Sequence, residues 1–141
     1  MIGLDTNILV RAITRDDATL SPIAITLLSG LSATSPGMIN AVVVAELAWT
    51  LRSGYGYERL EIVSLIERML RSQAYVFSDR DALNIATSRC KDEPLHLADA
   101  LLGEINRLAG CTTTMTFDSQ AAKSNAFTLL GTSAEPTPGP S

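Results

Sequence analysis

Cysteine and histidine are scarce in this sequence. The 141-residue chain has two cysteines, Cys90 and Cys111, and one histidine, His96. Two cysteines are too few for a disulfide scaffold, and these two do not have the spacing of a metal-binding cluster. A single histidine cannot build a zinc site. A disulfide-stapled domain and a zinc module are therefore excluded, and we expect His96 to lie on a helix surface.

Long hydrophobic runs and an excess of positive charge are also missing. No apolar stretch has the length that spans a bilayer, and the opening residues MIGLDTNILVRAI lack the basic leader and cleavage site of a secretory signal. We therefore expect a cytoplasmic protein with no membrane partner. The formal net charge is −4, and the eleven basic residues, most of them arginines, are scattered along the chain. Most of these should lie on solvated helix faces, so a nucleic acid would have to be held locally.

Strand-like and helix-like segments alternate along the chain. A hydrophobic content of 46% and a charged content of 18% indicate a globular domain. We place this domain at residues 1–131, followed by a disordered tail at residues 132–141. The predicted strands are residues 1–4, 35–39, 74–77, 111–117 and 127–131. The predicted helices are residues 8–13, 21–31, 40–53, 57–72, 78–90 and 94–110, with a short helix from about residue 120. This alternation predicts an α/β fold with a parallel sheet.

Capping residues and apolar stripes define several of these helices. We expect Ser21 to cap the second helix, with Pro22 at its first position, and Asn40 to cap the third, which ends near residues 53–56. The helix at residues 57–72 has an apolar stripe made of Ile62, Val63, Ile66, Met69 and Leu70. The stripe of the helix at residues 94–110 is predicted to be Leu97, Leu101, Ile105 and Leu108.

Four acidic residues have notable places in this pattern. Asp5 and Asp118 each follow a predicted strand, and ligands bind beyond the carboxyl ends of parallel strands. Glu46 is the only charge in AVVVAELAWTL, where we expect it to be half-buried. Asp99 lies in the first turns of its helix, away from the leucine stripe. Taken singly, Asp5, Asp99 and Asp118 are each explained as a helix cap or a solvated acid.

Convergence of the four carboxylates predicts a bound divalent cation. Carboxylates gathered in one pocket repel one another, and a cation relieves that repulsion. Ligands that are all oxygen, without a cluster of histidines or cysteines, favour Mg²⁺ or Mn²⁺ over zinc.

Four sequence blocks, GLDTNILVRAI, VAELAW, LADALL and TFDSQAAK, carry a family resemblance. In this order and separation they resemble the PIN-domain ribonucleases, most closely the VapC-type toxins of type II toxin–antitoxin systems, over residues 2 to about 131. The resemblance implies a three-layer α/β/α sandwich with a mostly parallel sheet of about five strands. It implies that the catalytic and metal-binding residues are Asp5, Glu46, Asp99 and Asp118. Its implied supporting or substrate-binding residues are Thr6, Asn7 and Arg11. Family members often have an aspartate where this chain has His96, which affects metal affinity.

The function implied by the resemblance is a Mg²⁺-dependent endoribonuclease that hydrolyses RNA phosphodiester bonds and arrests growth as a toxin. Carboxylate-held ions would activate a water molecule and offset charge on the leaving oxygen. The resemblance also implies a homodimer and a cognate antitoxin protein. A PIN nuclease of RNA processing and a non-catalytic interaction module with a vestigial acidic pocket are the alternatives. A phosphoaccepting receiver domain is disfavoured, because it needs paired acids after the first strand and a lysine after the last, whereas Lys123 lies within a predicted helix.

Overall fold

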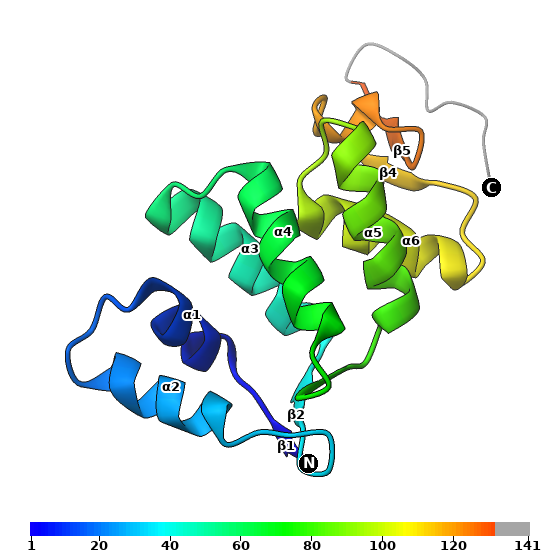
Figure 1. Ribbon diagram of the computed structural model, residues 1–141. Coiled ribbons are helices and arrows are strands. Elements are labelled where there is room, and N and C mark those ends of the chain that lie inside the picture. Colours follow the sequence, from blue (N-terminus) through cyan, green and yellow to red (C-terminus); the bar gives the residue numbers. More distant parts are fainter. Residues whose placement is uncertain (132–141) are drawn as a thin grey trace. The chain divides into compact units, whose positions relative to one another are not determined.

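The structure, a computed structural model, describes residues 1–131, and the predicted disordered tail at residues 132–141 lies outside the described residues. The chain divides into two compact units, Met1–Arg80 and Asp81–Ser141. Figure 1 shows the helices and strands of both units, and each unit is described by itself. The placement of one domain at residues 1–131 stays a prediction.

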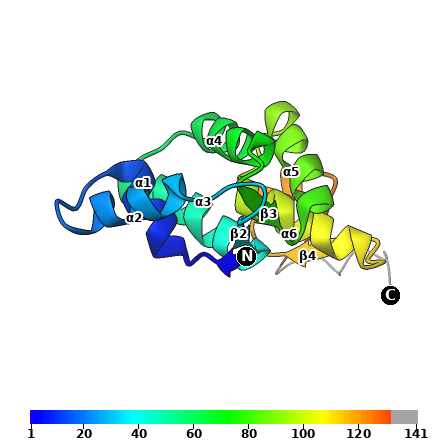
Figure 2. The same ribbon diagram turned by 60° about the horizontal axis from the view of Figure 1, so that its bottom comes forward.

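The first unit contains a three-stranded parallel sheet. Strand β1 (Ile2–Gly3) pairs with β2 (Gly37–Ile39), and β2 pairs with β3 (Tyr75–Phe77), as Figure 2 shows for β2 and β3. Gly37 allows β1 and β2 to approach, since a Cβ atom there would lie 2.6 Å from Cδ1 of Leu4. The parallel arrangement predicted from the strand–helix alternation is confirmed.

Four helices accompany this sheet: α1 (Thr6–Thr14), α2 (Leu20–Ser29), α3 (Ala41–Tyr55) and α4 (Arg59–Arg71). The predicted ends of α3 are confirmed. The side chain of Asn40 accepts a hydrogen bond from the backbone N–H of Val43 at 3.0 Å, and Gly56 ends the helix with φ 71°. The predicted stripe of α4 is also confirmed, because all five of its apolar residues are buried.

The predicted start of α2 is wrong. The helix begins at Leu20 rather than after Ser21, and the N-cap residue Thr19 makes no side-chain capping bond. The carboxylate of Asp17 instead accepts hydrogen bonds from the backbone N–H groups of Thr19 at 2.9 Å and Leu20 at 2.7 Å. Ser21 is buried, and its hydroxyl accepts a hydrogen bond from the backbone N–H of Asp17. An acid two residues before the N-cap therefore satisfies backbone N–H groups at the start of the helix, a role that the sequence assigned to Ser21.

The second unit contains α5 (Arg80–Asp92), α6 (Leu97–Leu108), β4 (Thr114–Thr116), the 3-10 helix η1 (Ala121–Lys123) and β5 (Phe127–Leu129). Helix α5 begins at the last residue of the first unit. Strands β4 and β5 form a parallel pair, so the five strands are divided between a sheet of three and a sheet of two. A Cβ atom at Gly103 would lie 3.2 Å from the Phe127 ring, which shows how closely α6 packs against β5.

The predicted apolar stripe of α6 is partly wrong. Leu97 and Leu101 are buried, but Leu108 is 52% exposed, whereas Glu104 is only 1% exposed. The buried positions 97, 100, 101 and 104 follow helical spacing, so the buried face is rotated relative to the predicted one. The prediction failed because it assumed that every charged residue of the helix faces solvent.

Within residues 1–131, no helix combines the length and the apolar character needed to cross a bilayer.

Candidate active site

Asp5 lies at the junction between β1 and α1. It is the N-cap residue of α1, and its Oδ1 accepts a hydrogen bond from the backbone N–H of Thr6 at 2.8 Å. The residue is exposed, and the bond engages one of the two carboxylate oxygens. Asp5 is therefore both a helix cap and an acid presented to solvent at the carboxyl end of a strand.

Thr6 connects Asp5 with Glu46. It is buried, at 7% exposure, and its hydroxyl donates a hydrogen bond to Oε1 of Glu46 at 3.3 Å. The backbone of Thr6 thus contacts the first acid and its side chain contacts the second, although 40 positions separate Thr6 from Glu46. The structure therefore brings two of the four predicted acids together around one residue. Asn7, the predicted supporting residue, is exposed in the first turn of α1.

Glu46 is not half-buried, so that prediction is wrong. It lies on an exposed face of α3 together with Val42, which is 65% exposed, and Trp49, which is 60% exposed. Positions 42, 46 and 49 share one side of a helix, and the buried residues Val43 and Leu47 lie on the other. The sequence shows that the neighbours of Glu46 are mostly apolar, but it does not show which of them contact its side chain. Its carboxylate is solvated and does not require a compensating positive charge.

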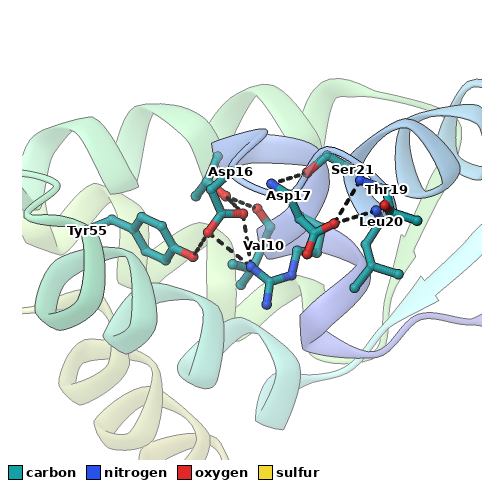
Figure 3. Close-up of polar contacts among 9 residues, drawn as sticks. Val10, Asp16, Asp17, Thr19, Leu20, Ser21 and Tyr55 are labelled. Carbon is teal, nitrogen blue, oxygen red and sulfur yellow. Dashed lines mark hydrogen bonds and ion pairs between the residues drawn. The ribbon is translucent and has the colours of Figure 1, made fainter.

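Asp16 and Tyr55 belong to a polar network near the end of α1 (Figure 3), which also includes Arg11. Nη1 of Arg11 donates hydrogen bonds to both carboxylate oxygens of Asp16, at 2.9 and 3.0 Å. The hydroxyls of Tyr55 and Thr14 also donate hydrogen bonds to Asp16. The bond from Tyr55, followed by that from Arg11, lowers the pKa of Asp16 to about 2. Asp16 in turn raises the pKa of Arg11, and the role of Arg11 toward substrate stays a prediction.

Asp118 lies beyond the carboxyl end of β4 in the second unit. Its Oδ1 accepts hydrogen bonds from the backbone N–H groups of Gln120 at 2.9 Å and Ala121 at 3.3 Å, so it orders the turn that leads into η1. Its own N–H donates a hydrogen bond to the hydroxyl of Thr116 at 2.9 Å. Like Asp5, it is an exposed acid that follows a parallel strand.

Asp99 lies in the first turn of α6 and is half-buried. His96 occupies the N-cap position of the same helix and is also half-buried. An acid in the first turn interacts favourably with the helix dipole, which explains its local stability.

The donor chemistry of the four acids fits a hard divalent cation. Every candidate ligand is a carboxylate oxygen, the donor that Mg²⁺ and Mn²⁺ prefer. Asp5 and Glu46 belong to the first unit, whereas Asp99 and Asp118 belong to the second. Among residues 1–131, no three histidine, cysteine, aspartate or glutamate side chains form a group that could hold a metal ion. The assignment of all four acids as metal ligands stays a prediction.

A buried ionic cluster in the second unit was not predicted from the sequence. Oε2 of Glu104 accepts a hydrogen bond from Nε of Arg107 at 2.9 Å, and Oε1 lies 4.0 Å from Nη2 of Arg89. Arg89 is an exception to the prediction that most arginines lie on solvated helix faces, because its side chain is 23% exposed. Glu104 and Arg107 are three positions apart in one helix and are therefore neighbours on its surface, so the sequence did indicate their contact. No comparable local signal existed for Arg89.

Comparison of the sequence with known protein families complements this geometry. The model of the PIN domain matches residues 2–126, while no curated protein matches the chain. The match and the α/β organisation with parallel strands confirm the predicted PIN-like α/β/α fold. PIN domains are generally nucleases that use divalent metal ions, so the match supports a nuclease-type function. The chain belongs to the PIN-domain family.

Proposed function

We propose that this protein is a Mg²⁺- or Mn²⁺-dependent endoribonuclease that acts as the toxin of a toxin–antitoxin pair. The observation that carries the proposal is the linkage of Asp5 and Glu46 through Thr6. A buried threonine that holds one acid through its backbone and another through its hydroxyl fixes the separation of the two carboxylates. Family membership supplies the nuclease class, and the oxygen-only donor set supplies the class of metal.

The proposed reaction is hydrolysis of an RNA phosphodiester bond. A water molecule forms a bond to phosphorus, the bond from phosphorus to the leaving oxygen breaks, and that oxygen takes up a proton. Asp5, Glu46, Asp99 and Asp118 would hold a divalent cation, which when bound would supply Lewis-acid stabilisation of the developing negative charge. The Thr6 hydroxyl orients Glu46, and the exposed amide of Asn7 is available to hydrogen-bond substrate. No protein nucleophile is needed in this scheme.

The toxin assignment rests on the resemblance of the four sequence blocks to VapC-type proteins. It includes a homodimer, a cytoplasmic site of action and a cognate antitoxin that covers the acidic residues. A PIN nuclease of RNA processing has the same chemistry, and a non-catalytic interaction module has the same fold. Activity separates the module from both nucleases, and growth arrest separates the toxin from the processing enzyme.

The test is cleavage of matched RNA and DNA oligonucleotides by the wild type, Asp5→Asn and Glu46→Gln, with Mg²⁺, Mn²⁺ or EDTA. We expect RNA cleavage only with metal, and a loss of at least about 100-fold in each variant, because a shared metal site fails when one ligand is neutralised. Asp81→Asn, an exposed acid of α5, is the control and should cleave like the wild type.

Growth after induction in cells completes this test. The wild type should arrest growth, and Asp5→Asn should relieve the arrest. RNA cleavage without growth arrest would favour the processing enzyme, and absence of cleavage under every metal condition would favour the interaction module. Cleavage that survives EDTA or both substitutions would contradict the proposed site.

A further inference from the structure

A polar cavity of about 260 Å³ lies within the second unit, and neither Asp99 nor Asp118 lines it. Its walls come from α5 through Arg89, from α6 through Arg107, from the segment of residues 111–114 that leads into β4, and from Asn125 ahead of β5. The lining includes two guanidinium groups, three consecutive threonines and an amide, and none of its residues is acidic. The cavity thus offers hydrogen-bond donors and positive charge to a ligand.

Glu104 holds the two guanidinium groups in place from behind the cavity wall. It is 1% exposed, it is absent from the cavity lining, and it contacts both arginines. A buried carboxylate is stable only when charged or hydrogen-bonding partners satisfy it, so each arginine is constrained by this contact. Arg89 is fixed further by hydrogen bonds from Nη1 to Ser124 at 3.3 Å and Asn125 at 3.1 Å, and by Glu93, which lies 3.4 Å from Nε.

Arg107 retains donors for a ligand. It uses Nε for Glu104, and among the hydrogen bonds of residues 1–131 its terminal nitrogens have no protein acceptor. Its side chain is 55% exposed, so these N–H groups are open to solvent at the cavity. A guanidinium held through Nε leaves a planar pair of terminal nitrogens, which match two oxygens of a phosphate group.

We propose that this cavity binds a phosphate group of the RNA backbone, with Arg107 as the main contact and the segment of residues 111–114 as the wall beside it. The RNA part of the assignment rests on the proposed function. In a chain with a net charge of −4, a polyanionic substrate has to be held by local groups, such as the terminal N–H groups of Arg107.

The cavity is displaced from Asp99 and Asp118 within the second unit. Arg107 follows Asp99 by eight positions in α6, which corresponds to about 12 Å of helix rise. Strand β4 ends at Thr116, and Asp118 follows that end. The cavity lies at the amino-terminal end of the β4–β5 pair and Asp118 at the carboxyl end. The bound phosphate therefore belongs to a nucleotide away from the cleaved bond.

Cys111 provides a reporter of occupancy in the native protein. It lines the cavity and is exposed, whereas Cys90, the other cysteine, is buried. The experiment measures the rate of Cys111 alkylation by N-ethylmaleimide, by mass spectrometry, in EDTA so that RNA is not cleaved. Single-stranded RNA, inorganic phosphate and buffer alone are compared for the wild type, Arg107→Gln and the control Arg71→Gln. Arg71 is exposed at the end of α4 in the first unit.

We expect saturating RNA to slow alkylation several-fold in the wild type and in Arg71→Gln, and much less in Arg107→Gln. RNA affinity should fall several-fold in Arg107→Gln, and the salt dependence of log K should decrease by about 0.7, the value for one phosphate contact on a single strand. Protection by inorganic phosphate but not by RNA would overturn the RNA assignment. Equal protection in Arg107→Gln and the wild type would overturn the site.

Two further measurements keep these outcomes distinct. The double variant Glu104→Gln/Arg107→Gln removes the buried carboxylate together with Arg107, one of its two arginine partners. If this variant melts at the same temperature as the wild type and loses RNA protection to the same extent as Arg107→Gln, the loss of protection is due to the cavity. Cleavage is assayed separately through the acid variants. If those variants keep activity while Arg107→Gln loses RNA protection, the proposed function fails and the phosphate site stands. If the wild type cleaves RNA and Arg107→Gln binds RNA as the wild type does, the phosphate site fails and the proposed function stands.

Discussion

At the scale of single residues, Thr6 contacts both Asp5 and Glu46, the two acids on which the proposed site depends. The place of Asp5 after a strand and before a helix was visible in the sequence, and the structure shows it capping α1. The contact between Thr6 and Glu46 was not visible, because it joins helices far apart in the chain. The exposure of Glu46 was mispredicted for the same reason, since the composition of a helix does not tell which face packs inward.

A prediction at this scale concerns Asp16 and Tyr55. Removing the hydroxyl in Tyr55→Phe should raise the pKa of Asp16 from about 2 toward its usual range, because that hydrogen bond is the largest cause of the lowered value. A carboxyl with a depressed folded pKa stabilises the protein above its unfolded pKa, and the stabilisation is lost as pH falls through the folded value. In the wild type, this loss should occur between about pH 4 and pH 2.

The measurement is an NMR titration of the Asp16 carboxyl carbon, combined with melting temperatures at several pH values. Tyr55→Phe should lose less stability than the wild type across that window. Tyr57→Phe serves as the control, since Tyr57 takes no part in the network around Asp16. An unchanged titration in Tyr55→Phe would contradict the assigned hydrogen bond.

Helices and strands were predicted better than single contacts. Helix α3 was identified from Asn40 at its start and the glycine-containing stop at its end, both of which act locally. The buried face of α4 was correct because every buried position of the helix is occupied by an apolar residue. Helix α6 was different, because a charged residue, Glu104, occupies a buried position where arginines meet it. Hydrophobic periodicity predicts the buried face of a helix only when the buried positions are occupied by apolar residues.

The N-cap of α3 gives a prediction at the scale of an element. Asn40→Ala removes the acceptor for the N–H of Val43 and should destabilise the protein by about 1 kcal/mol, or about 2–4 °C in melting temperature. Asn40→Asp keeps an acceptor oxygen and should melt close to the wild type. Thermal melts followed by circular dichroism measure both. Equal melting temperatures for Asn40→Ala and Asn40→Asp would show that the hydrogen bond does not stabilise α3.

At the scale of the whole molecule, the parallel α/β organisation followed from the order of segments in the sequence. The division of five strands into a sheet of three and a sheet of two did not, because strand pairing depends on contacts distant in sequence. The candidate site has the same property. Thr6 contacts both Asp5 and Glu46, and Glu46 lies 40 positions further along the chain than Thr6, so the sequence could nominate these acids only through position and resemblance.

The central proposal is that Asp5 and Glu46, which are both contacted by Thr6, act in one metal-dependent nuclease site. The most direct test is a double-mutant cycle of RNA cleavage with Asp5→Asn, Glu46→Gln and the double variant, at saturating Mg²⁺. Residues that serve one site are strongly non-additive. We predict that each single variant loses at least about 100-fold in rate and that the double variant is scarcely slower than either. Near-wild-type cleavage by either single variant, or losses that multiply in the double variant, would contradict a shared site.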